Sequence, residues 1–196
     1  PTSKGISTGY PEVDAHLGGW QEQRLYLLAA KTSIGKSALA INWGAHVARG
    51  APVLFISLEM PEGDVYTRLA ASVLRKPSDD MQATVYTEQS TAEVGDMFEA
   101  VSRLKFKVDD RGGRTISSIT AQARKHRRKH GLGLLIVDYL GLVEPTDKRL
   151  SRYEQLGTIS RGLKLIAKTL RIPVLALAQL NRQADQDGVR PQLHHL

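Results

Sequence analysis

The sequence contains no cysteine, so it can form neither a disulfide framework nor a metal site built on thiolates. Aromatic residues make up only 6% of the chain, and they form no array of the kind that stacks single-stranded bases. The apolar runs are shorter than the roughly 18 residues that a membrane-spanning helix needs. The first residues show no signal-peptide pattern. These absences favour a cytoplasmic protein with no membrane contact.

What the sequence does contain is typical of one globular domain. Its 196 residues are 41% hydrophobic and 24% charged, which is enough to bury a sizeable core. A net charge of +7 favours polyanionic partners such as nucleic acid, although many domains are basic without such a partner. The chain begins at Pro1 without a methionine, so we interpret it as a piece of a longer protein.

Five apolar runs alternate with segments of helical periodicity. The predicted strands are residues 24–30, 52–58, 106–109, 134–137 and 173–178. The predicted helices are residues 36–49, a segment opened by Pro61, a segment marked by Val94 to Leu104, one capped by Thr115 or Ser117 that runs to about His130, and one marked by Leu156 to Leu170. Residues 76–89 are expected to form a loop. The alternation predicts an α/β fold with a doubly wound, mostly parallel sheet and helices on both faces.

The residues that follow the strands form the candidate site, because ligands of such sheets bind at the carboxyl ends of the strands. Residues 30–37 open a helix and read AKTSIGKS, the P-loop pattern with Ala30 in place of the first glycine. Backbone N–H groups of such a turn form an anion nest, to which the helix N-terminus adds a positive partial charge. We predict that this turn binds the phosphates of ATP through Ala30, Lys31, Thr32, Ser33, Ile34, Gly35, Lys36, Ser37 and Ala38.

Three residues of this turn have defined roles in a P-loop site. Lys36 is expected to reach the β- and γ-phosphates, and the Ser37 hydroxyl is expected to ligate Mg²⁺. Gly35 lets the backbone approach the phosphates because it has no Cβ. Gly-Lys-Ser alone is common by chance, but its position at a strand–helix junction favours the functional interpretation.

Three further side chains stand at the ends of predicted strands. Asp138 is placed to hold the Mg²⁺ shell, with capping of the next turn as the alternative. Glu59 is placed to act as general base for the attacking water, with a plain surface glutamate as the alternative. The Gln179 amide can sense the γ-phosphate and report to the next loop, or it can satisfy buried backbone groups.

Two basic features could contact nucleic acid. Residues 124–130 form a dense basic run on a predicted helix, although a solvated face or a subunit contact is the more frequent outcome for such a run. Arg182 is the better DNA-binding candidate, because it follows Gln179 directly in the polar segment 181–191. Without an aromatic array we expect binding directed at the backbone rather than base readout.

Several motifs resemble a known family. Residues 5–19 resemble the lead-in of RecA-like ATPases. The motifs SLEM at 57–60, VDYL at 137–140, ISR at 159–161 with LK at 163–164, and QLNR at 179–182 together resemble the DnaB family of ring helicases. Recombinases share the lead-in and the P-loop but not this full set. The resemblance covers nearly the whole chain.

The resemblance implies a RecA-like motor that hydrolyses ATP with Mg²⁺ in a homohexameric ring. Such rings move 5′ to 3′ on single-stranded DNA and unwind the duplex, with primase and helicase loader as candidate partners in a bacterial or phage-infected cell. The implied catalytic residues are Glu59, Lys36 and Gln179, and the implied metal ligands are Ser37 and Asp138. Arg68 resembles the family arginine near the base or sugar of the nucleotide, and Arg182 a residue near the DNA channel.

The sequence also departs from the family pattern. Gly141 stands where the family usually has glutamine. The family's second DNA loop, its arginine finger and its N-terminal primase-contacting domain would lie outside the chain, so we interpret residues 1–196 as one RecA-like domain truncated at its C-terminal end. Two alternatives stay open: a recombinase or regulatory DNA-dependent ATPase without unwinding activity, and a module that binds nucleotide without useful hydrolysis.

Overall fold

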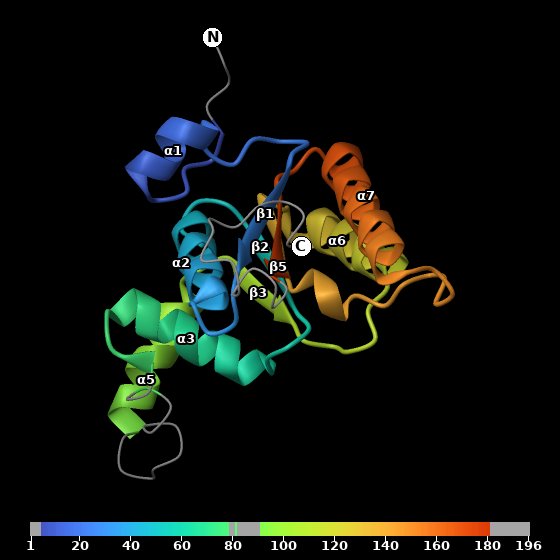
Figure 1. Ribbon diagram of the computed structural model, residues 1–196. Coiled ribbons are helices and arrows are strands. Elements are labelled where there is room, and N and C mark those ends of the chain that lie inside the picture. Colours follow the sequence, from blue (N-terminus) through green and yellow to red (C-terminus); the bar gives the residue numbers. More distant parts are fainter. Residues whose placement is uncertain (1–4, 79–80, 82–90, 181–196) are drawn as a thin grey trace.

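The computed structural model describes residues 5–78, 81 and 91–180 (Figure 1). Its strands are β1 (Leu25–Ala30), β2 (Val53–Ser57), β3 (Phe106–Asp109), β4 (Leu134–Asp138) and β5 (Val174–Gln179). Its α-helices are α1 (Pro11–Leu17), α2 (Lys36–Ala48), α3 (Glu62–Leu74), α5 (Thr91–Ser102), α6 (Ile116–His130) and α7 (Arg152–Leu170), and a 3-10 turn, η1 (Leu140–Leu142), follows β4. Each predicted strand and helix is confirmed, with small shifts at the ends.

The five strands form one parallel sheet in the order β1-β5-β4-β2-β3. Each strand is joined to the next along the chain by at least one helix, so the sheet is doubly wound, as the sequence predicts. The register places Ala30 opposite Gln179 and Ser57 opposite Asp138. The carboxyl ends of β1, β5, β4 and β2 therefore meet at one edge of the sheet, where ligands of such folds bind.

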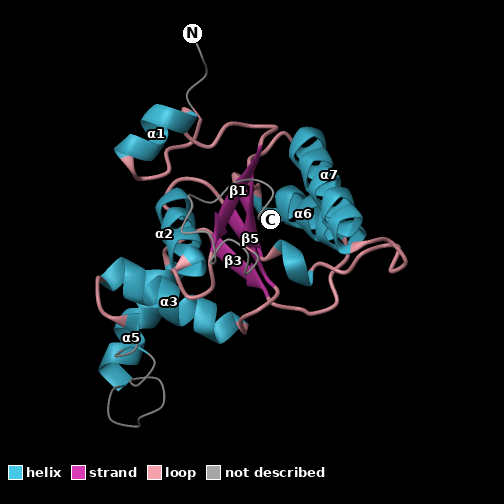
Figure 2. Ribbon diagram, viewed as in Figure 1, coloured by secondary structure: helices cyan, strands magenta, loops and turns pink. Residues whose placement is uncertain are grey.

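Helices cover both faces of the sheet (Figure 2), and each face has its own core. Successive residues of a strand point to opposite faces. On one face, Ile136 of β4 belongs to a buried cluster with Ile41 of α2 and Leu69 of α3. On the other face, Val137 belongs to a cluster with α6 and α7 that includes Leu163. The continuous apolar strands in the sequence follow from this burial on both sides.

Local signals fix the ends and the spacing of the helices. Thr115, one of the two predicted caps, begins α6 by accepting a hydrogen bond from a backbone N–H of the first turn. Ser151 and Glu154 form a reciprocal capping box that begins α7. Gly44 lets α2 approach the sheet, because a Cβ at this position would lie 2.6 Å from the Phe106 ring.

Some segments differ from the sequence prediction. The prediction missed η1 and α1, although Pro11 at the first turn of α1 and Gly18 at its end, with φ 71°, are usual helix boundary signals. Ser78 and Met81 are helical, although residues 76–89 were expected to form a loop, and the rest of that segment from 79 on lies outside the described residues. The segment 181–191 also lies outside them. Within the described ranges, no helix is long and apolar enough to cross a membrane.

Candidate nucleotide-binding site

The turn between β1 and α2 has the backbone shape of an anion-binding loop. Ser33 and Gly35 adopt left-handed conformations, with φ 61° and 97°. Gly35 is the N-cap of α2, and a Cβ built on it would meet no atom within 4 Å, so the space beside the helix N-terminus is open. Ala30 is not among the residues with positive φ, because it is still the last residue of β1. Alanine therefore fits where the P-loop pattern has its first glycine.

The Lys36 side chain folds back over the turn between β1 and α2. Its Nζ donates hydrogen bonds to the carbonyl oxygens of Ala30 and Lys31, both at 3.2 Å. The ammonium group thus lies over the open side of the turn, held by neutral acceptors that an anionic phosphate can replace. Ser37, the next residue, lies half-buried in the first turn of α2.

Asp138 is a buried carboxylate at the end of β4. Its residue surface is 1% exposed, and neither carboxylate oxygen has a hydrogen bond of acceptable geometry within the described residues. Burial raises the pKa of Asp138, and the nearby Glu59 charge raises it further. Ser37, Lys36 and Arg68 lie close enough to lower the same pKa, but they do not overcome the burial. A buried acceptor pair without a partner is costly, which suits a carboxylate that receives a cation.

Glu59 lies in a turn that hydrogen bonds between Ser57 and Met60 hold at the end of β2. The Ser57 hydroxyl donates to the Met60 carbonyl oxygen at 2.6 Å and accepts from the Met60 N–H at 3.3 Å. Glu59, between these residues, is exposed. Its charge is close enough to raise the pKa of Asp138, so the two carboxylates share one site.

Gln179 connects the end of β5 to the P-loop turn. Its Nε2 donates to the Thr32 hydroxyl oxygen at 2.7 Å, and the N–H of the next residue, Leu180, donates to the Ala30 carbonyl at 3.1 Å. The sequence predicted both Gln179 and Thr32 as site residues, but it gave no sign that they contact each other. Arg182, the predicted DNA-binding residue, lies outside the described residues.

Arg68 comes to the site from α3, one helix beyond Glu59. It is half-buried, and its charge lowers the pKa of Asp138. This electrostatic effect places the Arg68 charge on the same side of the molecule as the end of β4. The residues predicted from four segments, β1–α2, β2, α3 and β4, therefore face one region of the molecule.

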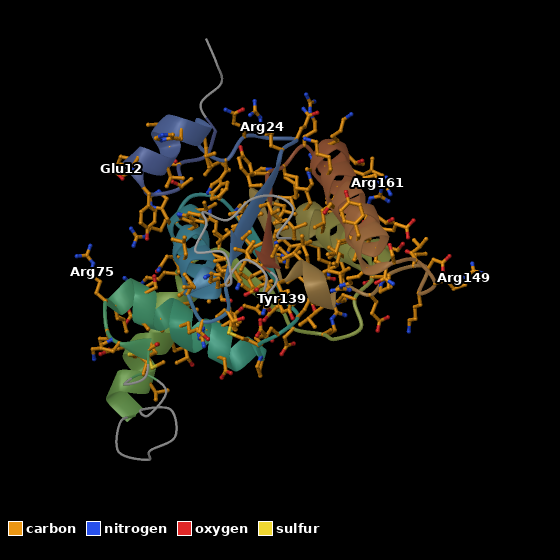
Figure 3. The ribbon with its side chains drawn as sticks, in the orientation of Figure 1. Glu12, Arg24, Arg75, Tyr139, Arg149 and Arg161 are labelled. Atoms are coloured by element: carbon orange, nitrogen blue, oxygen red, sulfur yellow. The ribbon has the colours of Figure 1, made fainter. Side chains whose placement is uncertain are left out.

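The structure gives a steric reason for the glycine at position 141, where the family usually has glutamine. A Cβ at this position would lie 2.5 Å from the ring of Tyr139, which Figure 3 labels at the lower end of the sheet. The Gly141 carbonyl also accepts a hydrogen bond of 2.6 Å from Nη2 of Arg152. Arg152 and Gln179 line the same cavity of about 340 Å³, which is a neighbourhood that sequence reasoning did not find.

These features define a class of protein. A glycine-containing turn after β1, a buried carboxylate after β4 and an amide after β5, on a doubly wound parallel sheet, give the chain the RecA-like fold of P-loop proteins. The sequence profile of the family described as "DnaB-like helicase C terminal domain" matches residues 5–196. The chain belongs to this family.

Relatives and solved structures agree with this assignment. The chain is 34% identical over 205 residues to the replicative DNA helicase DnaB of Rickettsia felis, covering 98% of the chain and 42% of that protein. It is 35% identical over 203 residues to the DnaB of Rhodothermus marinus, covering 21% of that protein. The chain thus spans less than half the length of the curated relatives it matches.

Two solved structures share the fold closely. One is a DnaB-like replicative helicase described with its interactions with primase, matched with a TM-score of 0.88 and 29% identity over 98% of the chain and 47% of the other. The second is described as an ATPase domain, and it is matched with the same TM-score and identity over 70% of its length. The sequence prediction of a DnaB-type RecA-like domain is therefore confirmed.

Proposed function

We propose that this chain is the ATP-hydrolysing motor domain of a replicative DNA helicase. In this proposal a homohexameric ring couples hydrolysis to 5′-to-3′ movement on single-stranded DNA and to duplex unwinding. The observation that supports it most is Asp138, a buried carboxylate beside Ser37, whose oxygens have no well-formed hydrogen bond among the described residues, at the same sheet edge as the Lys36 turn. The replicative helicases among its relatives support the helicase part.

The side chains present fit ATP with Mg²⁺. Mg²⁺ prefers oxygen ligands, and the half-buried Ser37 hydroxyl lies next to the buried carboxylate oxygens of Asp138. These two residues would hold the ion, which supplies charge neutralisation on the phosphate oxygens when bound. Lys36 and the open side of the turn at Gly35 would hold the phosphates themselves.

The remaining site residues have distinct chemical tasks. Glu59 is exposed beside Asp138, so its carboxylate can accept a proton from a water that attacks the γ-phosphate. Gln179 is already in contact with the P-loop turn through Thr32, so a change in that turn reaches the segment after β5. Arg68 adds a positive charge on the side of α3, toward the nucleotide.

The DNA and protein partners in this proposal rest on the family resemblance. Arg182 lies in the segment after Gln179, and we propose that it contacts the DNA backbone. Primase is a reasonable partner, since one similar helicase is described with its interactions with primase. A loader is proposed by the same family resemblance.

Nucleotide binding is the first test of the proposal. We would measure equilibrium binding of a fluorescent ATP analogue as Mg²⁺ is added, for the chain and for Asp138→Asn. The proposal expects Mg²⁺ to strengthen binding, and it expects Asp138→Asn to need at least about tenfold more Mg²⁺, or about 1.4 kcal/mol. Equal Mg²⁺ dependence in the two proteins would show that Asp138 does not help to bind the ion. Hydrolysis without strand displacement by the assembled ring would contradict the unwinding part alone.

A further inference from the structure

A cavity of about 380 Å³ lies at the opposite end of the sheet from the P-loop turn. It is formed where the chain enters β2 and β3 and where α6 ends. Its lining residues are Pro52, Leu104, Lys105, Phe106, Lys107, His126 and His130. The cavity therefore has three apolar residues and four residues that carry or can carry a positive charge. Among the described residues, none that lines it is acidic.

The two lysines differ in how far they are already engaged. Lys107 of β3 donates from Nζ to a carboxylate oxygen of Glu62 at 3.0 Å, so part of its charge is neutralised. Lys105 donates to a neutral acceptor, the Gly50 carbonyl oxygen at 3.3 Å, and has no ion pair within the described part of the chain. The C-terminus of α6 brings about half a negative charge to this region. The charge of Lys105 alone exceeds this half charge, so the lining of the cavity has a net positive charge.

His126 is the buried group of this cavity. It is 8% exposed, and its buried Nε2 has no hydrogen-bond partner among the residues that the structure describes. Its ring contacts the ring of His130 one turn later, with centroids 5.1 Å apart. Burial lowers the pKa of His126, and the charges of His130 and Lys107 lower it further. These surroundings thus disfavour the protonated form of His126, and a bound anion would favour it.

A metal ion is a poorer occupant than an anion. Two histidines four residues apart on a helix can chelate a transition metal. The described residues contain no group of three or more His, Cys, Asp or Glu side chains that could complete such a site. The lysines beside the histidines would also repel a cation. The composition of the cavity instead matches an anion with an apolar part, held between cations and the wall formed by Leu104 and Phe106.

We propose that this cavity is a binding site for a small phosphate-bearing ligand, with the phosphate on Lys105, His126 and His130 and the apolar part against Phe106. Lys107 supports the site from the edge of β3. A doubly charged phosphate can accept hydrogen bonds from both imidazole rings and from the Lys105 ammonium at once. The ligand would bind at the amino ends of the strands, remote from the nucleotide, and its binding needs no nucleotide.

The imidazole resonances test this site directly. The chain has six histidines, and His126 and His130 can be assigned by comparing spectra of His126→Gln and His130→Gln. We would titrate ¹³C-labelled protein in pH at several concentrations of inorganic phosphate, and separately of phenyl phosphate. We expect phosphate to raise the titration midpoint of His126 by about one pH unit. We expect phenyl phosphate to bind at least threefold more tightly than inorganic phosphate, because its ring meets the apolar wall.

Matched lysine variants separate the cavity from the outer surface of α6. Lys105→Met should weaken phenyl phosphate binding about tenfold, whereas Lys125→Met, on α6 but not in the cavity, should leave it unchanged. The shift of the His126 resonance on adding phenyl phosphate should likewise be smaller in Lys105→Met and unchanged in Lys125→Met. Phenyl phosphate binding that Lys125→Met weakens and Lys105→Met does not would place the ligand on the outer face of α6 and overturn the cavity proposal. So would a His126 that responds to Zn²⁺ and not to phosphate, or one that responds to neither.

Discussion

Nε2 of Gln179 donates a hydrogen bond of 2.7 Å to Oγ1 of Thr32, which joins the end of β5 to the P-loop turn across 147 positions of the chain. The turn binds phosphate in the proposed function, and the segment after β5 carries Arg182. This side-chain hydrogen bond and the one from the Leu180 N–H to the Ala30 carbonyl oxygen therefore lie between the proposed nucleotide site and the proposed DNA contact. Any phosphate group that attracts the Gln179 amide must compete with Thr32 for it.

Without the Thr32 hydroxyl, the Gln179 amide should be free to bind the phosphate. A neutral hydrogen bond contributes roughly 0.5 to 1.5 kcal/mol net, so Thr32→Val should tighten ATP binding about two- to tenfold. Isothermal titration calorimetry with ATP and Mg²⁺ measures this change. Thr169→Val, an exposed threonine on α7, serves as the control. Weaker binding by Thr32→Val would mean instead that the hydroxyl contacts the nucleotide.

Glu59→Gln should separate binding from hydrolysis. The amide keeps the shape of the side chain but cannot accept the proton of the attacking water, so turnover should fall about 10²- to 10⁴-fold. ATP affinity should change little, because no phosphate contact is lost. Single-turnover hydrolysis and equilibrium binding, measured on the same preparation, give both quantities. Glu62→Gln, on α3 and paired with Lys107, is the matched control. Full turnover by Glu59→Gln would show that Glu59 is not the general base.

Asp109 should make the fold sensitive to acid. Burial alone would raise its pKa, but hydrogen bonds from Arg111 and Arg114 prevail and lower the pKa of Asp109 to about 2. Its ordinary value is 3.8. Since the folded protein holds the carboxylate more strongly than the unfolded chain does, the stabilisation is complete above about pH 4 and is lost as pH falls toward 2.

The corresponding variant is Asp109→Asn. It should lower the free energy of unfolding at pH 7 by at least about 2 kcal/mol, because it also leaves the buried Arg114 unpaired. Urea unfolding at pH 7 and near pH 3 should show a smaller difference from the parent chain at the lower pH. Asp147→Asn removes an exposed pair with Arg149 and should have little effect at either pH. An equal loss of stability at both pH values would contradict the ionic account.

The sequence predicts the sheet well because each strand is buried on both faces. The run at 134–137 reads as a strand without any help from its neighbours, and the carboxylate that follows it becomes informative once the P-loop is recognised. The Thr32–Gln179 contact could not be predicted, because it depends on the register that places Ala30 opposite Gln179. Such a register is set by the packing of the whole sheet.

Other parts of the site depended on neighbours distant in sequence. Gly141 departs from the family pattern, but only the structure shows the Tyr139 ring that occupies the space of a side chain there. The basic run on α6 was open to several interpretations. Its buried member, His126, is distinguished from its exposed neighbours only by the packing of α6 against the sheet.

The most direct test of the account is ATP turnover by this chain, with and without single-stranded DNA, beside Lys36→Ala and the control Lys168→Ala. The account predicts Mg²⁺-dependent hydrolysis that DNA stimulates, that Lys168→Ala retains and that Lys36→Ala loses by at least about a hundredfold. Hydrolysis that survives in Lys36→Ala, or ATP binding that is indifferent to this substitution, would contradict the assignment of the turn after β1 as the nucleotide site.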